Sequence, residues 1–252
     1  MVSVLWLFPL FLCWGSFLNV VGYRIIRGLS VVAPRSYCPH CRKTIYWYDN
    51  IPVISWLKLN GVCRHCKKPI SFLYPFIELI TALSLTTVAL LVPHHYFLSF
   101  FIFFSALIVT TRTDLEKMLI SRFMTLFLVP LGIGFASFGL LPIDLLDSLI
   151  GALAGYGLLW LTKTIFYRFK GQEGLGQGDL DLLCFIGSFT GLFGIWFSLL
   201  IGSVTGSIVG IVYLITHKKT REVKIPFGPF LALGAMSYVL LSPYLLLLFS
   251  SY

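Results

Sequence analysis

Four carboxylates stand in two pairs at the edges of long apolar segments. The pairs are Asp114 with Glu116, in TRTDLEKMLISR, and Asp179 with Asp181, in GLGQGDLDLL. Charge at the border of a bilayer is costly and usually has either a partner or a chemical role. Two carboxylates at one depth could share a proton, one acting as general base on a water and the other as general acid. The alternative is that they begin helices and are stabilised by the helix macrodipole.

The second pair follows a glycine-rich turn in which Gly176 and Gly178 precede Asp179. Glycine has no side chain, so the backbone can bend there and approach a substrate closely. The pattern therefore predicts that Gly176 and Gly178 support chemistry at Asp179.

Four cysteines form a second group that could do chemistry. They are Cys38 and Cys41 in CPHC, and Cys63 and Cys66 in CRHC. Each Cys-x-x-Cys turn aims two thiolates at one ion, and two such turns complete a tetrahedral sulfur shell that suits structural zinc. Disulfides and redox chemistry are the alternatives, and a reducing cytoplasm argues against stable disulfides. We expect His40 and His65, inside the two turns, to stay outside the metal shell.

The composition indicates a membrane protein. The chain has 252 residues, is 58% hydrophobic and 12% charged, and has a mean hydropathy of +0.90. A soluble domain carries about twice that share of charge. The net charge of +9 does not indicate nucleic acid, because Lys and Arg gather in alternate connections between apolar segments, one of them 218–224. That distribution follows the positive-inside rule and predicts that the basic connections face the cytoplasm.

Apolar segments long enough to cross a bilayer recur along the chain. We expect eight spans, over 2–22, 75–92, 96–112, 122–141, 145–167, 180–192, 194–216 and 228–249. The first has no preceding basic region and is expected to be a retained span instead of a signal peptide. The predicted fold is an all-α polytopic membrane protein with about eight transmembrane helices and a small cytoplasmic zinc-binding loop domain.

The predicted domains follow from these spans. Residues 1–22 form the first helix, 23–74 the zinc-binding loop domain, and 75–252 a seven-helix membrane domain. Within the loop, the aromatic stretch 47–61 is expected either to pack the zinc module at the membrane interface or to form a wall of a substrate groove. Glu78, early in the second span, is expected to be buried and paired with an Arg or Lys.

The motifs together resemble one family along nearly the whole chain. These are GSFLNVVGYR (15–24), the stretch from CPHC through YDNIPVISW and NGVCRHCKKPIS to YPFIE (38–78), TDLEKMLI (113–120), GQGD (176–179) and IPFGPFLALG (225–234). They resemble the motifs of prepilin peptidases, also called type IV leader peptidases. The GxGD motif alone would be weak evidence for this family, whereas the listed motifs together are specific for it.

The resemblance implies an aspartic endopeptidase of the bacterial cytoplasmic (inner) membrane. Such enzymes cut the leader from type IV prepilins or type II secretion pseudopilins after a glycine, on the cytoplasmic side. Many then methylate the new N-terminal residue, often Phe, with S-adenosylmethionine. The family's catalytic aspartates fall on Asp114 and Asp179, its zinc ligands on the four cysteines, and a glycine associated with methyl transfer on Gly61. No Gly-rich dinucleotide-type fingerprint marks a site for S-adenosylmethionine.

Two positions depart from the family's pattern. Where the family usually has IPD, this chain has Arg122 in the acidic position, and where it usually has GD-x-K, this chain has Asp181 in the lysine position. An acid and a base have exchanged places, so we predict an ion pair between Arg122 and Asp181 that links the two aspartate segments. The alternative is independent drift at two solvated positions.

Three functions are consistent with the sequence. The first is a bifunctional prepilin peptidase and N-methyltransferase with prepilin or pseudopilin substrates, zinc and S-adenosylmethionine. The second is a peptidase without methylation, and the third is a non-enzymatic membrane assembly factor with a zinc module. Two aspartate motifs at one predicted face favour an enzyme. A transporter fits less well, because the acidic residues lie at one face instead of mid-membrane.

Overall fold

The computed structural model is all-helical apart from two isolated β-bridges among the residues it describes, which are 2–171, 174, 176–217 and 225–249. The basic connection 218–224 lies outside them. Contacts divide the chain into two units, Met1–Leu90 and Leu91–Tyr252, and each is described by itself. The domain limits expected from the sequence remain a prediction.

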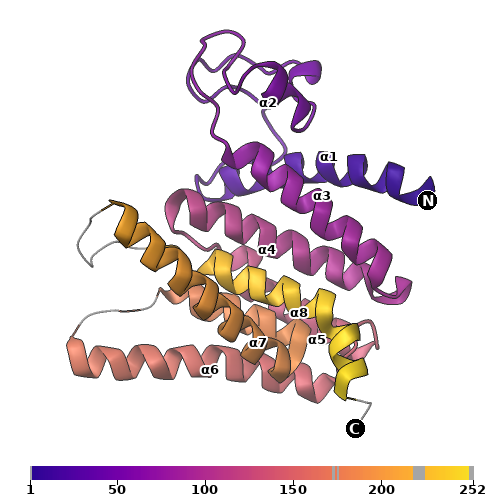
Figure 1. The fold of residues 1–252 in the computed structure, drawn as a ribbon, viewed down its shortest axis with the longest axis vertical. Coiled ribbons are helices and arrows are strands. Elements are labelled where there is room, and N and C mark those ends of the chain that lie inside the picture. The colour runs from indigo at the N-terminus through magenta and orange to yellow at the C-terminus, as the bar shows by residue number, and fades with distance from the viewer. Residues whose placement is uncertain (1, 172–173, 175, 218–224, 250–252) are drawn as a thin grey trace. The chain divides into compact units, whose positions relative to one another are not determined.

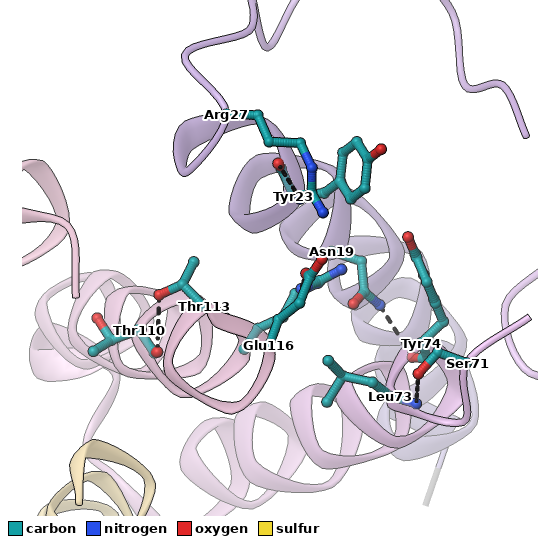
Figure 2. Close-up of polar contacts among 10 residues, drawn as sticks. Asn19, Tyr23, Arg27, Ser71, Leu73, Tyr74, Thr110, Thr113 and Glu116 are labelled. Atoms are coloured by element: carbon teal, nitrogen blue, oxygen red, sulfur yellow. Dashed lines mark hydrogen bonds and ion pairs between the residues drawn. The ribbon is translucent and has the colours of Figure 1, made fainter. Parts of the chain in front are cut away.

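The first unit is built on two apolar helices, α1 (Val2–Ile25) and α3 (Leu73–Leu91) (Figure 1). They approach closely at Gly15, where a Cβ atom would lie 2.9 Å from the Cα of Glu78. The amide of Asn19 donates to the carbonyl of Tyr74 at 3.0 Å, which fixes the start of α3 against α1 (Figure 2). A glycine and one buried amide thus set the register of this helix pair.

The loop between α1 and α3 contains two short helical segments, η1 (Trp47–Asp49) and α2 (Ile54–Lys58). Its first part is tied to the end of α1 by Arg24, which is only 4% exposed. The guanidinium donates to the carbonyls of Ser30 and Val31 at 2.8 and 3.1 Å, and to that of Pro34 at 2.5 Å. A buried cation therefore holds a segment with no regular secondary structure.

The second unit contains the remaining helices (Figure 1). In chain order they are η2 (His94–Tyr96), α4 (Phe97–Lys117), η3 (Arg122–Met124), η4 (Leu126–Leu128), α5 (Val129–Ser137), α6 (Leu145–Lys170), α7 (Gln177–His217) and α8 (Gly228–Phe249). Helices α6, α7 and α8 lie side by side in sequence order.

Glycines let α6 and α7 approach at backbone distance. A Cβ atom at Gly151 would lie 2.4 Å from the carbonyl oxygen of Gly187, and one at Gly155 would lie 2.4 Å from that of Leu183. The paired numbers rise in α6 and fall in α7, so the first part of α7 runs antiparallel to α6. Small residues are the usual means of close helix packing in a membrane.

Helix α7 is two helices that meet at Gly191, which has φ 67° and ψ −166°. Its first part begins beside Ile120, because a Cβ atom at Gly178 would lie 2.6 Å from the Cβ of Ile120. The start of α8 also lies beside Ile120, because a Cβ atom at Gly228 would lie 3.1 Å from Cδ1 of Ile120. The second part of α7 packs along α8, where Gly202 meets Phe230.

The start of α7 and its second part near Gly202 therefore both lie close to Ile120 and the start of α8. A straight helix would separate Gly178 from Gly202 by about 36 Å. The chain reverses at Gly191. The sequence predicts a break between spans 180–192 and 194–216, and the structure has it there. A carboxylate closes the turn, because Asp147 accepts the N–H of Leu192 at 3.2 Å.

Among the described residues, five helices are long and apolar enough to cross a membrane: α1, α3, η2 with α4, α6, and α7, the last of these reversing at Gly191. Together with the apolar α8, they describe a multi-pass membrane protein. The count of eight spans stays a prediction.

The segment expected to be one span over 122–141 is different in the structure. It forms two single 3-10 turns and then α5, which has nine residues. Thr125, at φ −125° and ψ −83°, interrupts the helix between the two turns. Pro130 has no N–H to donate to the preceding turn, so it favours a helix that starts beside it.

Changing Gly191 to alanine should destabilise the second unit. A Cβ atom there would lie 2.1 Å from a carboxylate oxygen of Asp147, and the backbone conformation is one that almost only glycine adopts. We expect Gly191→Ala to lower the free energy of unfolding by about 1–3 kcal/mol, measured by thermal unfolding in detergent. Gly157→Ala is the matched control, because Gly157 is helical and has open space around its Cα. Equal melting temperatures for Gly191→Ala and Gly157→Ala would contradict a reversal of the chain at Gly191.

Candidate active site and metal centre

Asp114 lies in the last turn of α4 and is 5% exposed. This is the helix end at which the macrodipole disfavours an acid, so Asp114 is not a helix-start carboxylate of α4. Its Oδ2 instead accepts the N–H of Gly228 at 3.0 Å. Gly228 is the first residue of α8. The positive end of another helix therefore stabilises this buried carboxylate.

Asp179 is the third residue of α7, where the macrodipole favours an acid. Its carboxylate turns back toward Gly176 and accepts the backbone N–H of that residue. A side chain on Gly176 would crowd it, because a Cβ atom there would lie 3.3 Å from Oδ2 of Asp179. Asp179 therefore stands at the start of a helix, as the alternative interpretation expects. This position is compatible with a chemical role for its carboxylate.

Ile120 joins the two aspartate segments. It lies six residues after Asp114 and touches Gly178, next to Asp179, as well as Gly228, which binds Asp114. Asp114 and Asp179 are close enough to interact electrostatically. The structure thus brings together the two aspartates that the sequence predicts as a pair. Two half-buried or buried carboxylates that repel each other favour a state in which one proton is shared between them.

The predicted ion pair between Arg122 and Asp181 is present. Nε of Arg122 donates to Oδ2 of Asp181 at 3.0 Å, and the Arg122 side chain is 60% exposed while that of Asp181 is 2% exposed. Gln177 donates to the other oxygen of Asp181 at 3.5 Å and to the hydroxyl of Tyr156 at 3.1 Å. The exchange of acid and base is therefore coupled, and independent drift at two solvated positions is excluded by the burial of Asp181.

Glu116, the fourth carboxylate of the two pairs, is bound within its own helix. It forms an ion pair with Arg112, one turn earlier in α4, and the Arg112 side chain is 1% exposed. Thr113, between them, donates its hydroxyl to the carbonyl of Thr110 at 3.0 Å (Figure 2). These contacts stabilise the last turns of α4, which carry Asp114.

The four predicted metal ligands converge in the first unit. The thiols of Cys38, Cys41, Cys63 and Cys66 all lie within 4.8 Å of one another. Sγ of Cys38 and Sγ of Cys66 are 3.9 Å apart, close to the roughly 3.8 Å that a tetrahedron with zinc–sulfur bonds of about 2.3 Å requires. The cluster contains neither His40 nor His65.

Each pair of cysteines sits in the same kind of turn. The N–H of Cys38 binds the carbonyl of Lys43, and the N–H of Cys63 binds that of Lys68. The residue after the second cysteine has a positive φ in both turns, 57° at Arg42 and 58° at Lys67. Two copies of one turn thus face each other, which is the arrangement a four-thiolate zinc site needs.

The thiols of the cluster differ in acidity. Burial raises the pKa of Cys38 to about 11, whereas the backbone N–H of Cys66 lowers the pKa of Cys63 to about 7. Beside the cluster, Arg64 donates to Asp49 at 2.6 and 2.7 Å, and this hydrogen bonding lowers the pKa of Asp49. The bidentate pair ties the second turn to η1.

Gly61 has φ +66° and lies against the indole of Trp56, where a Cβ atom would be 2.9 Å from Cζ2. The indole N–H donates to the carbonyl of Ile70 at 3.1 Å. Gly61 therefore positions α2 beside the second cysteine turn. This contact supports the first interpretation of the aromatic stretch 47–61, as packing of the zinc module.

Comparison with known proteins assigns the chain to a family. Residues 10–92 match the Bacterial Peptidase A24 N-terminal domain, and residues 101–211 match the Type IV leader peptidase family. A prepilin leader peptidase/N-methyltransferase of Aeromonas hydrophila is 37% identical over 92% of this chain and 88% of its own length. The chain belongs to the type IV leader peptidase family.

Other relatives of the same description extend the comparison. One from Burkholderia pseudomallei (strain 1026b) is 36% identical over 87% of this chain and 71% of its own length. One from Legionella pneumophila is 32% identical over 82% and 72%. No solved structure matches the chain. The two family segments fall almost entirely within the two structural units, so in this leader peptidase the cysteine cluster and the aspartate pair belong to separate units.

Sequence reasoning was wrong about the partner of Glu78. Glu78 is buried, as predicted, but its Oε2 accepts the backbone N–H of Val53 at 2.8 Å instead of pairing with a basic side chain. Val53 has φ 61° and ψ −51°, a strained conformation for a β-branched residue. The proline before it indicates a turn, but no sequence signal predicts a positive φ at a valine.

The ion pair of Arg122 and Asp181 should contribute a measurable coupling energy to the stability of the protein. Arg122→Ala leaves the buried Asp181 carboxylate without its cation, and we expect it to lose more stability than Arg122→Ala combined with Asp181→Ala. Because Arg122 is largely exposed, a coupling energy of about 1–2 kcal/mol is expected, between the values for surface and buried pairs. Thermal unfolding of the four proteins in detergent measures it.

The control for these four proteins returns the acid and the base to the positions where the family usually has them. Arg122→Asp combined with Asp181→Lys should recover stability that each single substitution loses. If the double exchange is no more stable than the worse single variant, the pair does not link the two segments.

Proposed function

We propose that this protein cleaves the leader from type IV prepilins or type II secretion pseudopilins and then methylates the new N-terminal amine. The observation that carries the peptidase half is the contact of Ile120 with Gly178 and Gly228, which brings Asp114 and Asp179 together. The relatives described as prepilin leader peptidase/N-methyltransferases support both halves.

Asp114 and Asp179 divide the chemistry of cleavage between them. The ionised carboxylate removes a proton from a water, which attacks the carbonyl carbon of the leader's last glycine. The protonated carboxyl donates its proton to the leaving nitrogen as the C–N bond breaks. The leader departs with a new carboxylate, and the mature protein keeps a new amine. Because Asp114 is held by the N–H of Gly228 and Asp179 by that of Gly176, neither carboxylate needs to reorient during the reaction.

The basic connections between the helices set the orientation of the protein in the membrane. Basic connections mark the cytoplasmic side, and both aspartates lie at helix ends next to such connections. We place the enzyme in the bacterial inner membrane with the cysteine loop and the aspartates at the cytoplasmic face. An apolar prepilin helix would remain in the bilayer while its basic leader extends into the cytoplasm, so the scissile bond lies where Asp114 and Asp179 meet.

The four-cysteine cluster fits zinc by its donor set and its spacing. We assign zinc a structural role, because four thiolates fill its tetrahedral shell and leave no position for a substrate. S-adenosylmethionine supplies the methyl group as an electrophile bound to a sulfonium. We assign methylation to the N-terminal unit, and Gly61 a positioning role through Trp56.

Removing either catalytic carboxylate should abolish cleavage. Asp114→Asn and Asp179→Asn cannot exchange a proton with water, and we expect cleavage of a full-length prepilin in detergent to fall by about 10³-fold or more. Mass spectrometry of the substrate N-terminus is the measurement. Asp144→Asn is the matched control, since Asp144 is an exposed carboxylate before α6. Unimpaired cleavage by both variants would favour a non-enzymatic assembly factor.

Loss of one cysteine should separate the two activities. Cys66→Ser removes one ligand, and we expect the zinc content, measured by mass spectrometry of the metal, to fall from about one per chain to near zero. Methylation should be lost while cleavage persists. Cys13→Ser, a free thiol outside the cluster, should keep its zinc. Zinc that survives in Cys66→Ser would contradict the four-thiolate assignment.

A further inference from the structure

A cavity of about 400 Å³ lies in the N-terminal unit, between one face of α1 and the loop that follows it. The helix lines it with Cys13, Ser16, Phe17, Val20 and Arg24, and the loop lines it with parts of 31–36 and 50–52. The volume falls within the roughly 300–1,000 Å³ of small-molecule sites. Leader cleavage, as proposed above, does not use this cavity.

One end of the cavity is positively charged. Arg24 is buried and donates to the carbonyls of Ser30, Val31 and Pro34. A guanidinium has five N–H groups, so these three carbonyls leave at least two for a ligand. Arg35 directly follows Pro34 and adds a second guanidinium to the lining. In the part of the chain that the structure describes, the lining holds no Asp or Glu and no carboxylate pairs with Arg24. A buried cation without a counter-ion is unfavourable, so this end favours an anionic group.

The rest of the lining is mostly apolar. Cys13, Phe17 and Val20 follow one another at spacings of four and three residues, so they form an apolar stripe on one face of α1. The stripe ends at Arg24, four residues later. On the loop side of the cavity, Val32 is 94% exposed, so the protein leaves its side chain almost uncovered. This lining suits a ligand that joins an anionic group to a long apolar part.

The length of the stripe matches the depth of one leaflet of a bilayer. From Cys13 to Arg24, α1 rises about 16 Å, and half of the hydrocarbon core of a bilayer is about 15 Å thick. Helix α1 is apolar enough to span the membrane, and Arg24 lies in its last turn. The charged end therefore stands at the level of the lipid head groups, and the stripe runs along the acyl chains of the same leaflet. A small soluble anion would leave the stripe unused, and a zwitterionic lipid would bring a cation beside the two guanidiniums.

The protein itself holds the walls of the cavity in place. Arg24 fixes the segment around Pro34 to α1. Glu78, from α3, holds the strained turn at Val53, immediately after Pro52 in the lining. The carbonyl of Ser36, also in the lining, accepts the N–H of Ile45 at 2.9 Å. The wall thus continues directly into the first cysteine turn.

We propose that this cavity binds an anionic phospholipid, with the phosphate at Arg24 and Arg35 and one acyl chain along the stripe on α1. Guanidinium groups bind phosphate oxygens through paired, charge-assisted hydrogen bonds, and basic pockets at the cytoplasmic side of membrane helices suit such head groups. Under the proposed orientation the lipid belongs to the cytoplasmic leaflet. Because Ser36 is tied to the first cysteine turn, the bound lipid holds the cysteine cluster at the membrane surface. Binding of the lipid requires neither leader cleavage nor methylation.

Native mass spectrometry of the full-length protein in detergent, titrated with phosphatidylglycerol, measures the bound lipid directly. Two variants alter the cavity: Arg35→Glu reverses a charge at an exposed loop position, and Val20→Trp places a larger side chain in the stripe. We expect each to weaken binding by about tenfold or more, the first through charge and the second through space. The matched controls lie outside the lining. Lys43→Glu reverses an exposed charge in the same loop, and Leu83→Trp enlarges an exposed side chain on α3.

Melting temperatures equal to that of the wild type show that the variants are folded. Wild-type affinity in both cavity variants, or the same loss in the matched controls, would overturn the proposal by placing the lipid elsewhere on the protein. Phosphatidylcholine bound as tightly as phosphatidylglycerol would overturn the selection for an anionic lipid. Inorganic phosphate whose binding is lost in Arg35→Glu and unchanged in Val20→Trp would assign the cavity to a soluble anion instead. None of these outcomes bears on the proposed function, because no reaction is measured.

Discussion

The contact of Ile120 with two glycines is the constraint on which the unit that carries Asp114 and Asp179 depends. Gly178 begins the helix that carries Asp179, and Gly228 begins the helix whose amide holds Asp114. Any side chain at either glycine would separate these helix ends and the two carboxylates with them. The reversal of α7 at Gly191 follows from the same requirement, because only a hairpin returns the chain to Ile120 so that α8 can start there. Glycine contacts between α6 and α7 keep that hairpin in register.

Three of the buried charges are held by backbone groups. Asp114 and Glu78 each accept a backbone N–H, and Arg24 donates to backbone carbonyls. Asp181 instead has a side-chain cation, Arg122. Backbone partners belong to the fold and cannot be exchanged by substitution, whereas an ion pair can reverse its polarity when both members change. The two aspartate segments can therefore exchange charges at Arg122 and Asp181, whereas a basic residue in place of Asp114 would leave the N–H of Gly228 without its acceptor.

The sequence predicted those parts of the site that depend on residue type and local spacing. The four cysteines could be placed together because each turn is local and zinc requires four ligands. The pairing of Arg122 with Asp181 could be predicted because two departures from one pattern compensated each other. The partner of Glu78, the strained Val53 and the interruption of the helix at Thr125 could not, because they depend on backbone geometry set by tertiary contacts.

The aspartate pair balances two opposite influences on its protons. Peptide hydrolysis by carboxylates requires a proton held between two acids, and mutual repulsion of Asp114 and Asp179 favours that state. Each of the two carboxylates also accepts a backbone N–H, from Gly228 and from Gly176, and such a hydrogen bond favours the ionised form. Repulsion thus keeps one proton in the pair, and the two amides oppose the uptake of a second. A side-chain cation bound to either carboxylate would favour a pair with no proton at all, and the cation of this region is bound to Asp181 instead.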